Sequence, residues 1–210
     1  EVLRYLGEKY RIDVVTRPVD DPVRGYKYIL GAQQIGRHPN FGESGRAVLD
    51  AARMVYRQGA TVFKLALSDR YGFQNGVPVQ PESDIANLVD LVSGESTIKA
   101  VLDMPFRDML FWVSAFTDKG WGQHATENAG SLSQDYKDEV YEQIFDLTEY
   151  LRTTYDGTGR RFYIGNWEGD WLLSFEGAQD PLNDVDPDKV AGMIEWATVR
   201  QQAIDDAKLA

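Results

Sequence analysis

The regular alternation of strand-like and helix-like segments is the feature that most constrains the fold of this 210-residue chain. Apolar runs rich in β-branched and aromatic residues predict strands, and apolar residues at helical spacing predict helices. We expect strands at 26–35, 61–67, 109–116 and 161–166, and helices at about 44–58, 83–92, 96–102, 135–153 and from Asp186-Pro187-Asp188 onward. Because a helical crossover joins each strand to the next, the four strands should be parallel and adjacent in chain order.

Long polar loops follow the predicted strands, whereas short turns follow the predicted helices. This asymmetry places a functional rim at the carboxyl ends of the strands. Both (β/α)8 barrels and doubly wound sheets obey that rule. The sequence therefore predicts an α/β domain over 26–210, preceded by an N-terminal segment, 1–25.

Composition excludes several classes of function. The chain carries 22 Lys and Arg against 33 Asp and Glu, and its net charge of −11 argues against binding to nucleic acid or to an anionic membrane surface. It contains no cysteine and only His38 and His124, which supplies a zinc site poorly. We therefore expect no metal and no cofactor. No secretory signal and no apolar run of about 18 residues are recognisable, and the cellular compartment stays open.

The most informative motif is Gly165-Asn166-Trp167-Glu168-Gly169-Asp170-Trp171, which directly follows the fourth predicted strand. Strand geometry would place Asn166, Glu168 and Asp170 on one face, together with Phe162 and Ile164. Burial beside an indole ring would raise the pKa of Glu168, as a general acid requires near neutral pH. An acid, an amide and aromatic rings together favour a sugar site. The alternative is an exposed loop with two structural tryptophans.

The stretch that ends at Glu168 resembles the N-terminal half of a (β/α)8-barrel glycoside hydrolase, of the superfamily whose acid/base Glu lies at the end of strand four. Supporting residues are the first-strand run 31–36 and the residues before the next helix, Phe41-Gly42-Glu43-Ser44. The resemblance implies a (βα)4 half of a TIM-like barrel, with Glu168 as the general acid/base and Asn166 as a partner of a sugar hydroxyl.

Half a barrel cannot complete such a site, because the nucleophile of that superfamily lies on strand seven. We therefore expect either a homodimer or association with a C-terminal half. An open sheet of four parallel strands also leaves two edges and one face to be covered. In a two-fold dimer, Asp118 of one copy would approach Glu168 of the other.

Further substrate contacts are expected along the same rim. The predicted contacts are Gln33 and His38 at the first strand, Asp118 and His124 after the third, and Asn166, Trp167, Asp170 and Trp171 after the fourth. For both histidines, an ordinary loop position remains an equal alternative.

Two other functions stay open. The domain could be a non-catalytic carbohydrate-binding or structural half-barrel that self-associates. Alternatively, Lys64 lies within the second strand, and a desolvated lysine at such a position can form a Schiff base, as in aldolases. A structural ion pair or a solvent-reaching side chain is the ordinary role for Lys64.

Overall fold

The computed structural model describes residues 31–33, 46–77, 84–117, 132–166 and 187–210. Within these ranges the chain is a mixed α/β structure with an all-parallel sheet. The sheet contains the strands β1 (Gly31–Gln33), β2 (Val62–Leu67), β3 (Asp108–Val113) and β4 (Arg161–Gly165). Their order in the sheet is β1-β2-β3-β4, and each neighbouring pair is parallel. The predicted order and direction of the strands are therefore confirmed.

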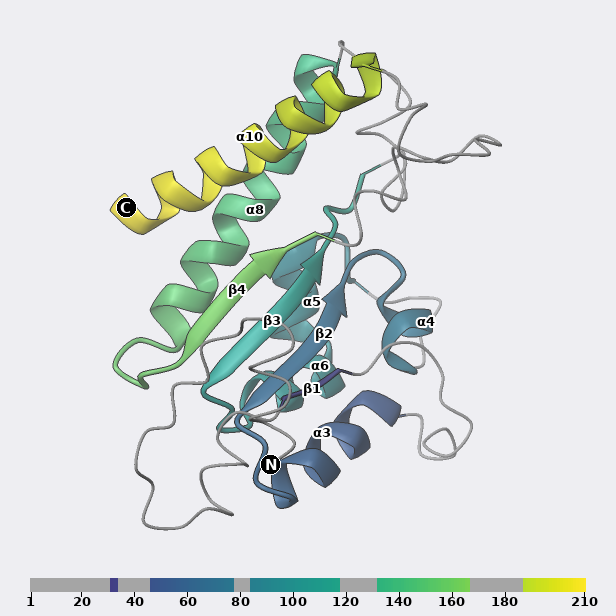
Figure 1. Ribbon diagram of the computed structural model, residues 1–210, viewed down its shortest axis with the longest axis vertical. Helices are drawn as coiled ribbons and strands as arrows, with labels where there is room; N and C mark the ends of the chain where they lie inside the picture. The colour runs from purple at the N-terminus through teal and green to yellow at the C-terminus, as the bar shows by residue number, and fades with distance from the viewer. Residues whose placement is uncertain (1–30, 34–45, 78–83, 118–131, 167–186) are drawn as a thin grey trace, which may run out of the picture.

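Six helices accompany the strands in the described residues (Figure 1). They are α3 (Ala47–Arg57), α4 (Tyr71–Asn75), α5 (Leu88–Gly94), α6 (Ser96–Leu102), α8 (Gln134–Thr154) and α10 (Pro187–Leu209). Helices α5 and α6 lie behind the sheet in Figure 1, α8 runs along the β4 side of the sheet, and α10 runs across α8.

One face of the sheet forms the hydrophobic core with these helices. Register aligns Phe63 of β2 with Met109 of β3 and Phe162 of β4, and one pleat further along it aligns Leu65, Phe111 and Ile164. These side chains share one packed cluster with apolar residues of α3, α5, α6 and α8. Removing that apolar surface from water is the main stabilising contribution to the fold.

The long helix α8 follows its sequence pattern closely. Helical spacing predicts a buried face of Val140, Ile144, Leu147 and Leu151, and all four are in the core. The helix begins after Ser133, whose hydroxyl accepts a hydrogen bond from the amide of Tyr136 at 3.3 Å. Helix α5 begins at Leu88, five residues later than predicted, because the side chain of Asn87 caps it by accepting from the Asp90 amide at 2.8 Å.

The buried face of α10 differs from the predicted one. Apolar residues at helical spacing predict a buried stripe of Val190, Met193, Ile194, Ala197 and Ile204, but Ile194 is 62 % exposed and Ala197 is also exposed. The buried residues are instead Gly192, Trp196, Arg200, Ala203 and Ala207. Small residues let α10 approach its neighbours closely, and a buried arginine occupies a position that an apolar pattern does not reveal.

Two further predictions were wrong, one on the end of a strand and one on a stretch expected to be a loop. Strand β3 ends at Val113 rather than at Phe116, because the backbone of Phe116 bonds to a side chain of α8 instead of a neighbouring strand. The polar stretch after β2 contains the short helix α4, which sequence analysis treated as a loop. Four of the five α4 residues are buried, so this segment is part of the packed structure.

Candidate functional site

Parallel strands bring their carboxyl ends to one edge of the sheet, and this carboxyl edge is the candidate site. In the described residues, Ser68 follows β2, Ser114 follows β3 and Asn166 follows β4. Ser68 is fully buried, whereas Asn166 is exposed. Asn166 is therefore an exposed residue at the carboxyl end of β4.

Most of the predicted site residues lie outside the described residues. These are His38, Asp118, His124, Trp167, Glu168, Asp170 and Trp171. Gln33 is the last residue of β1, where only its backbone is described, and it pairs with Lys64 of β2. The structure thus places Gln33 and Asn166 at strand ends, on the two edge strands of the sheet.

The side chains of β4 that the sequence groups with Asn166, Phe162 and Ile164, point toward the helices and not toward the open face of the sheet. Phe162 and Ile164 pack against the helices, and Tyr163 lies on the opposite face with 48 % of its surface exposed. Residues in phase with Phe162 would therefore point toward the helix-covered side if β4 continued regularly. The chain must leave strand geometry after Gly165 for Asn166 to be exposed, and regular structure does end at that residue.

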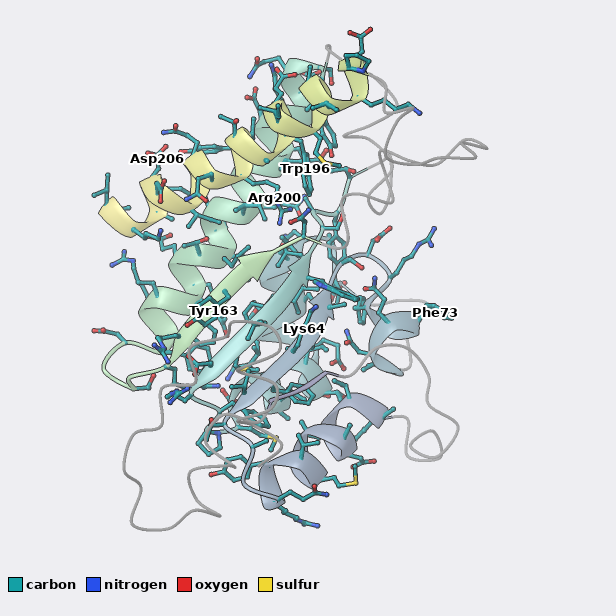
Figure 2. The ribbon with its side chains drawn as sticks, in the orientation of Figure 1. Lys64, Phe73, Tyr163, Trp196, Arg200 and Asp206 are labelled. Atoms are coloured by element: carbon teal, nitrogen blue, oxygen red, sulfur yellow. The ribbon has the colours of Figure 1, made fainter. Side chains whose placement is uncertain are left out.

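Buried amide side chains secure the end of β2. The Asn75 side chain, which is fully buried, donates from Nδ2 to the carbonyl oxygen of Ala66 at 2.7 Å. Ser68 donates to the side-chain oxygen of Gln74 at 2.6 Å and accepts from the Arg70 amide at 3.0 Å. These bonds tie α4 to β2. Phe73 of α4 points outward and is 69 % exposed (Figure 2).

A second buried amide holds the chain just beyond β3. The side chain of Gln143 on α8 donates to the carbonyl oxygen of Phe116 at 2.7 Å and accepts from its amide at 3.0 Å. These two bonds replace the strand partner that Phe116 lacks. The chain is thereby anchored as it leaves β3 toward the rim.

The carboxyl ends of β3 and β4 are joined by Arg200 of α10. Its Nη1 donates to the carbonyl oxygen of Val113 at 2.9 Å, and its Nη2 donates to that of Gly165 at 3.0 Å. The guanidinium also lies over the Trp196 ring, 4.4 Å from the centroid. Burial lowers the pKa of Arg200 to about 10, and the nearby Tyr136 acts in the opposite direction, so Arg200 is charged at neutral pH.

The face of the sheet opposite the helices carries charged and aromatic side chains beside apolar ones. Lys64, Leu110 and Tyr163 are aligned across β2, β3 and β4, and Lys64 and Tyr163 lie on the face turned to the viewer in Figure 2. The Lys64 ammonium lies 3.8 Å from the centroid of the Trp112 ring. A cation over an indole face is stabilised in its charged form.

Sequence reasoning did not select Asn75, Gln143 or Arg200. Amides and arginines inside amphipathic helices are usually read as solvated residues. For Arg200 a signal was present, because it lies four residues after Trp196 and in phase with Gly192, Ala203 and Ala207. Only the small residues in that stripe made its burial recognisable.

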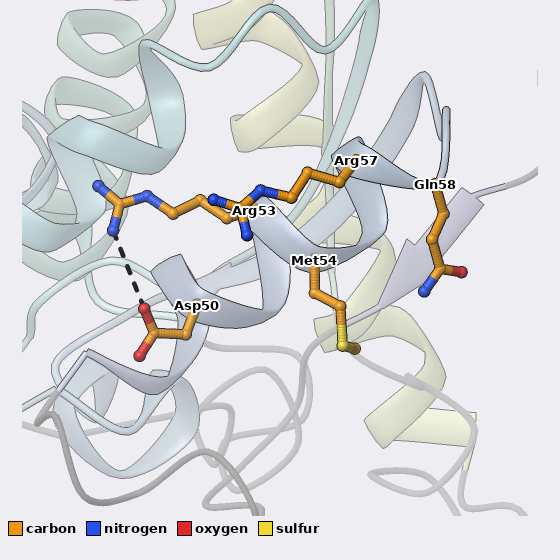
Figure 3. Close-up of a pocket in the computed structure, with 5 residues that line it drawn as sticks. All are labelled: Asp50, Arg53, Met54, Arg57 and Gln58. Carbon is orange, nitrogen blue, oxygen red and sulfur yellow. Dashed lines mark ion pairs between the residues drawn. The ribbon is translucent and has the colours of Figure 1, made fainter.

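Other surface features add no chemistry to the carboxyl edge. A pocket of about 430 Å³ lies on α3, lined by Asp50, Arg53, Met54, Arg57 and Gln58 (Figure 3). Its Arg53 and Asp50 form an ion pair at 3.9 Å on the exposed side of the helix. Across the described ranges, no three His, Cys, Asp or Glu side chains are grouped as a metal site would require. None of the described helices has both the length and the apolarity to cross a membrane.

The comparisons with known proteins give no match: no family model, no curated protein and no solved structure is similar to this chain.

Proposed function

We propose that this chain is the N-terminal half of a (β/α)8-barrel glycoside hydrolase, with Glu168 as its general acid/base. The observation that carries the proposal is the place of the Asn166-Trp167-Glu168 motif, which follows directly after the fourth of four consecutive parallel strands. Asn166 is exposed there, as a residue that contacts a sugar hydroxyl must be.

The strand order supports a barrel over a doubly wound sheet. A doubly wound sheet reverses its strand order at a switch point, where its ligand binds. The order β1-β2-β3-β4 contains no such reversal in the described residues, and one face of the sheet packs against α3, α5, α6 and α8 together. Consecutive strands with helices on one side are the arrangement of a barrel wall.

The opposite face would then be the barrel interior. Barrel interiors are filled by side chains from alternate strand positions. Lys64, Trp112 and Tyr163 would meet there the side chains of a second half, either a further part of a longer protein or a second copy of this chain. That half would also supply the second carboxylate that glycoside hydrolysis requires.

The Schiff-base alternative has less support. A lysine that attacks a carbonyl must lose its proton, and desolvation without a compensating partner favours that loss. The contact of Lys64 with the Trp112 ring stabilises the protonated form instead. Borohydride trapping with a carbonyl substrate should therefore give no adduct at Lys64.

The proposal is tested by replacing Glu168 with Gln in the complete enzyme, in which a second half closes the barrel. General-acid help is typically worth about 10²–10⁴-fold, so turnover of glycosides with poor leaving groups should fall by about two orders of magnitude or more. Activated aryl glycosides should be less affected, because their leaving groups need little protonation. Equal loss for both substrate types would contradict a general-acid role.

Mechanism-based labelling with fluoroglycosides separates the enzyme from a non-catalytic sugar-binding domain. A hydrolase of the retaining type would accumulate a covalent glycosyl intermediate. Sugar binding with neither labelling nor hydrolysis would favour the non-catalytic alternative.

A further inference from the structure

We propose that Arg200 is a positioning residue, which fixes the carboxyl end of β4 against that of β3 and thereby places Asn166 for the reaction. Arg200 itself contacts backbone carbonyls and has no assigned contact with substrate. This inference rests on the proposed function, because Asn166, which directly follows the carbonyl group that Arg200 holds, is the proposed partner of a sugar hydroxyl.

The geometry of the two hydrogen bonds supports this role. The carbonyl groups of Val113 and Gly165 belong to the last residues of β3 and β4. Gly165 pairs with Trp112, and this is the last pair of the regular ladder between the two strands. The hydrogen bonds of Arg200 therefore join the strands at the point where their own pairing ends. A planar guanidinium offers two parallel donors at a fixed spacing, which the single ammonium of lysine does not.

The side chain of Arg200 is itself firmly held. Trp196 precedes it by one helical turn and packs against the guanidinium, and both point toward the strand ends in Figure 2. Helix α10 is held on α8 by two contacts, one from Lys137 to Glu195 at 2.9 Å and one from Tyr141 to Asp206 at 2.7 Å. The guanidinium is therefore mounted on packed helices rather than on a loop.

The buried charge of Arg200 links two strand ends. Only 6 % of Arg200 is exposed, and it donates to two neutral carbonyl groups. An apolar side chain at this position would leave both carbonyl groups without that donor. The link lies directly beside the candidate site, because Gly165 immediately precedes Asn166.

Amide hydrogen exchange on the full chain tests the positioning directly. The variants are Arg200→Met, which removes both donors, and Arg200→Lys, which retains one ammonium. The control is Tyr141→Phe, which loosens α10 on α8 without touching a strand carbonyl. Arg200→Met should raise exchange about ten-fold at 113–117 and 165–166, with β2 unchanged. Arg200→Lys should fall between, and the control should leave both strand ends unchanged.

Steady-state kinetics of the completed barrel with aryl glycosides test the consequence for the reaction. Arg200→Met should lower kcat by about 10²-fold with little change in KM, because misplacement of a catalytic group by about 1 Å has an effect of that size. In Arg200→Ala, added guanidinium ion should recover part of the lost kcat. A purely structural role would instead lower the thermal midpoint and give no rescue.

Two results would overturn the inference. One is exchange that rises equally in β2, β3 and β4, which would make Arg200 a contributor to global stability alone. The other is local exchange as expected but with kcat retained, which would show that the strand ends need no such fixing. If the barrel completed by a second copy or by a C-terminal half hydrolyses no glycoside, the proposed function fails, and the reaction part of the inference fails with it. The exchange result still reports on the strand ends in that case.

Discussion

The two edges of the sheet are held together by different chemistry. At the carboxyl edge, Asn75, Gln143 and Arg200 are buried and donate to backbone carbonyl groups. At the amino edge, ion pairs join the beginnings of the strands. Asp108, only 5 % exposed, accepts from Arg161 at 2.6 Å and from Arg107 at 2.5 Å.

A second polar cluster extends the amino edge. Asp103 accepts from Lys99 at 2.5 Å and from the Tyr155 hydroxyl at 2.9 Å. Arg160 donates to the carbonyl oxygens of Met104 and Phe106 at 2.8 and 3.1 Å, and lies over the Tyr155 ring. Carboxylates are thus paired with cations where β3 and β4 begin.

The difference shows how a parallel sheet can separate stability from function. At the amino edge, charged groups pair with one another and hold together the segments that lead into β3 and β4. At the carboxyl edge, the buried donors satisfy backbone carbonyls and leave Asn166 exposed. Because the described clamps at that edge contain no carboxylate, they would not compete with a catalytic acid for a proton.

Glycine replacements should give the largest difference between the edges. Gly76 ends α4 at the carboxyl edge with φ +62°, and a Cβ there would lie 2.6 Å from the Cβ of Ala47. Gly76→Ala should therefore cost about 3 kcal/mol of unfolding free energy, from backbone strain and overpacking together. Gly157, in the turn before β4, has φ +68° with nothing within 4 Å, so Gly157→Ala should cost about 1 kcal/mol. Urea unfolding measures both, and equal losses would contradict the close packing of α4 on α3.

Loss of the Asn75 clamp should have an intermediate effect. Asn75→Ala leaves the buried carbonyl of Ala66 without its partner, which should lower the unfolding free energy by about 2 kcal/mol. Ser93 makes a side-chain to backbone bond of equal length on the exposed side of α5, so Ser93→Ala is the matched control and should be nearly neutral. Similar thermal midpoints for both variants would show that the Asn75 bond adds little.

Acid should weaken the amino edge by a smaller amount. Burial raises the pKa of Asp103 and of Asp108, but hydrogen bonds from Lys99 and Tyr155, and from Arg161 and Arg107, outweigh it and hold both values below the ordinary range. A carboxyl with a lowered pKa stabilises the fold above about pH 4, and this contribution is lost as pH falls through the lowered values. The effect is modest because Lys99 and Arg161 are partly solvated.

The paired variant Asp103→Asn with Asp108→Asn should therefore show less loss of unfolding free energy than the unmodified chain between about pH 6 and pH 3. Urea unfolding at the two pH values makes the comparison. Asn75→Asp, which introduces a carboxyl at the other edge, serves as a contrast, because a buried carboxyl without a cation should be destabilising at neutral pH and less so in acid. An unchanged pH response in the paired variant would remove the ion pairs as the cause.

Sequence reasoning was most successful where one periodic pattern decides the outcome. Strand order, strand direction and the buried face of α8 follow from hydrophobic spacing and from the need for right-handed crossovers. It failed for α10, whose buried face consists of Gly, Ala, Trp and Arg, because the helix docks by close approach rather than by a wide apolar stripe. It failed also for α4, where glycine and polar residues hide a packed turn.

The sequence by itself determined the parallel α/β sheet and the place of the Asn166-Trp167-Glu168 motif after its fourth strand, since local periodicity and chain connectivity suffice for both. Only the tertiary structure decided that Tyr163 lies on the open face and that Phe162 faces the helices. It alone also brought Arg200 to the ends of β3 and β4, 87 positions from Val113 and 35 from Gly165. Such contacts depend on how helices pack across the sheet, which no local pattern in the chain encodes.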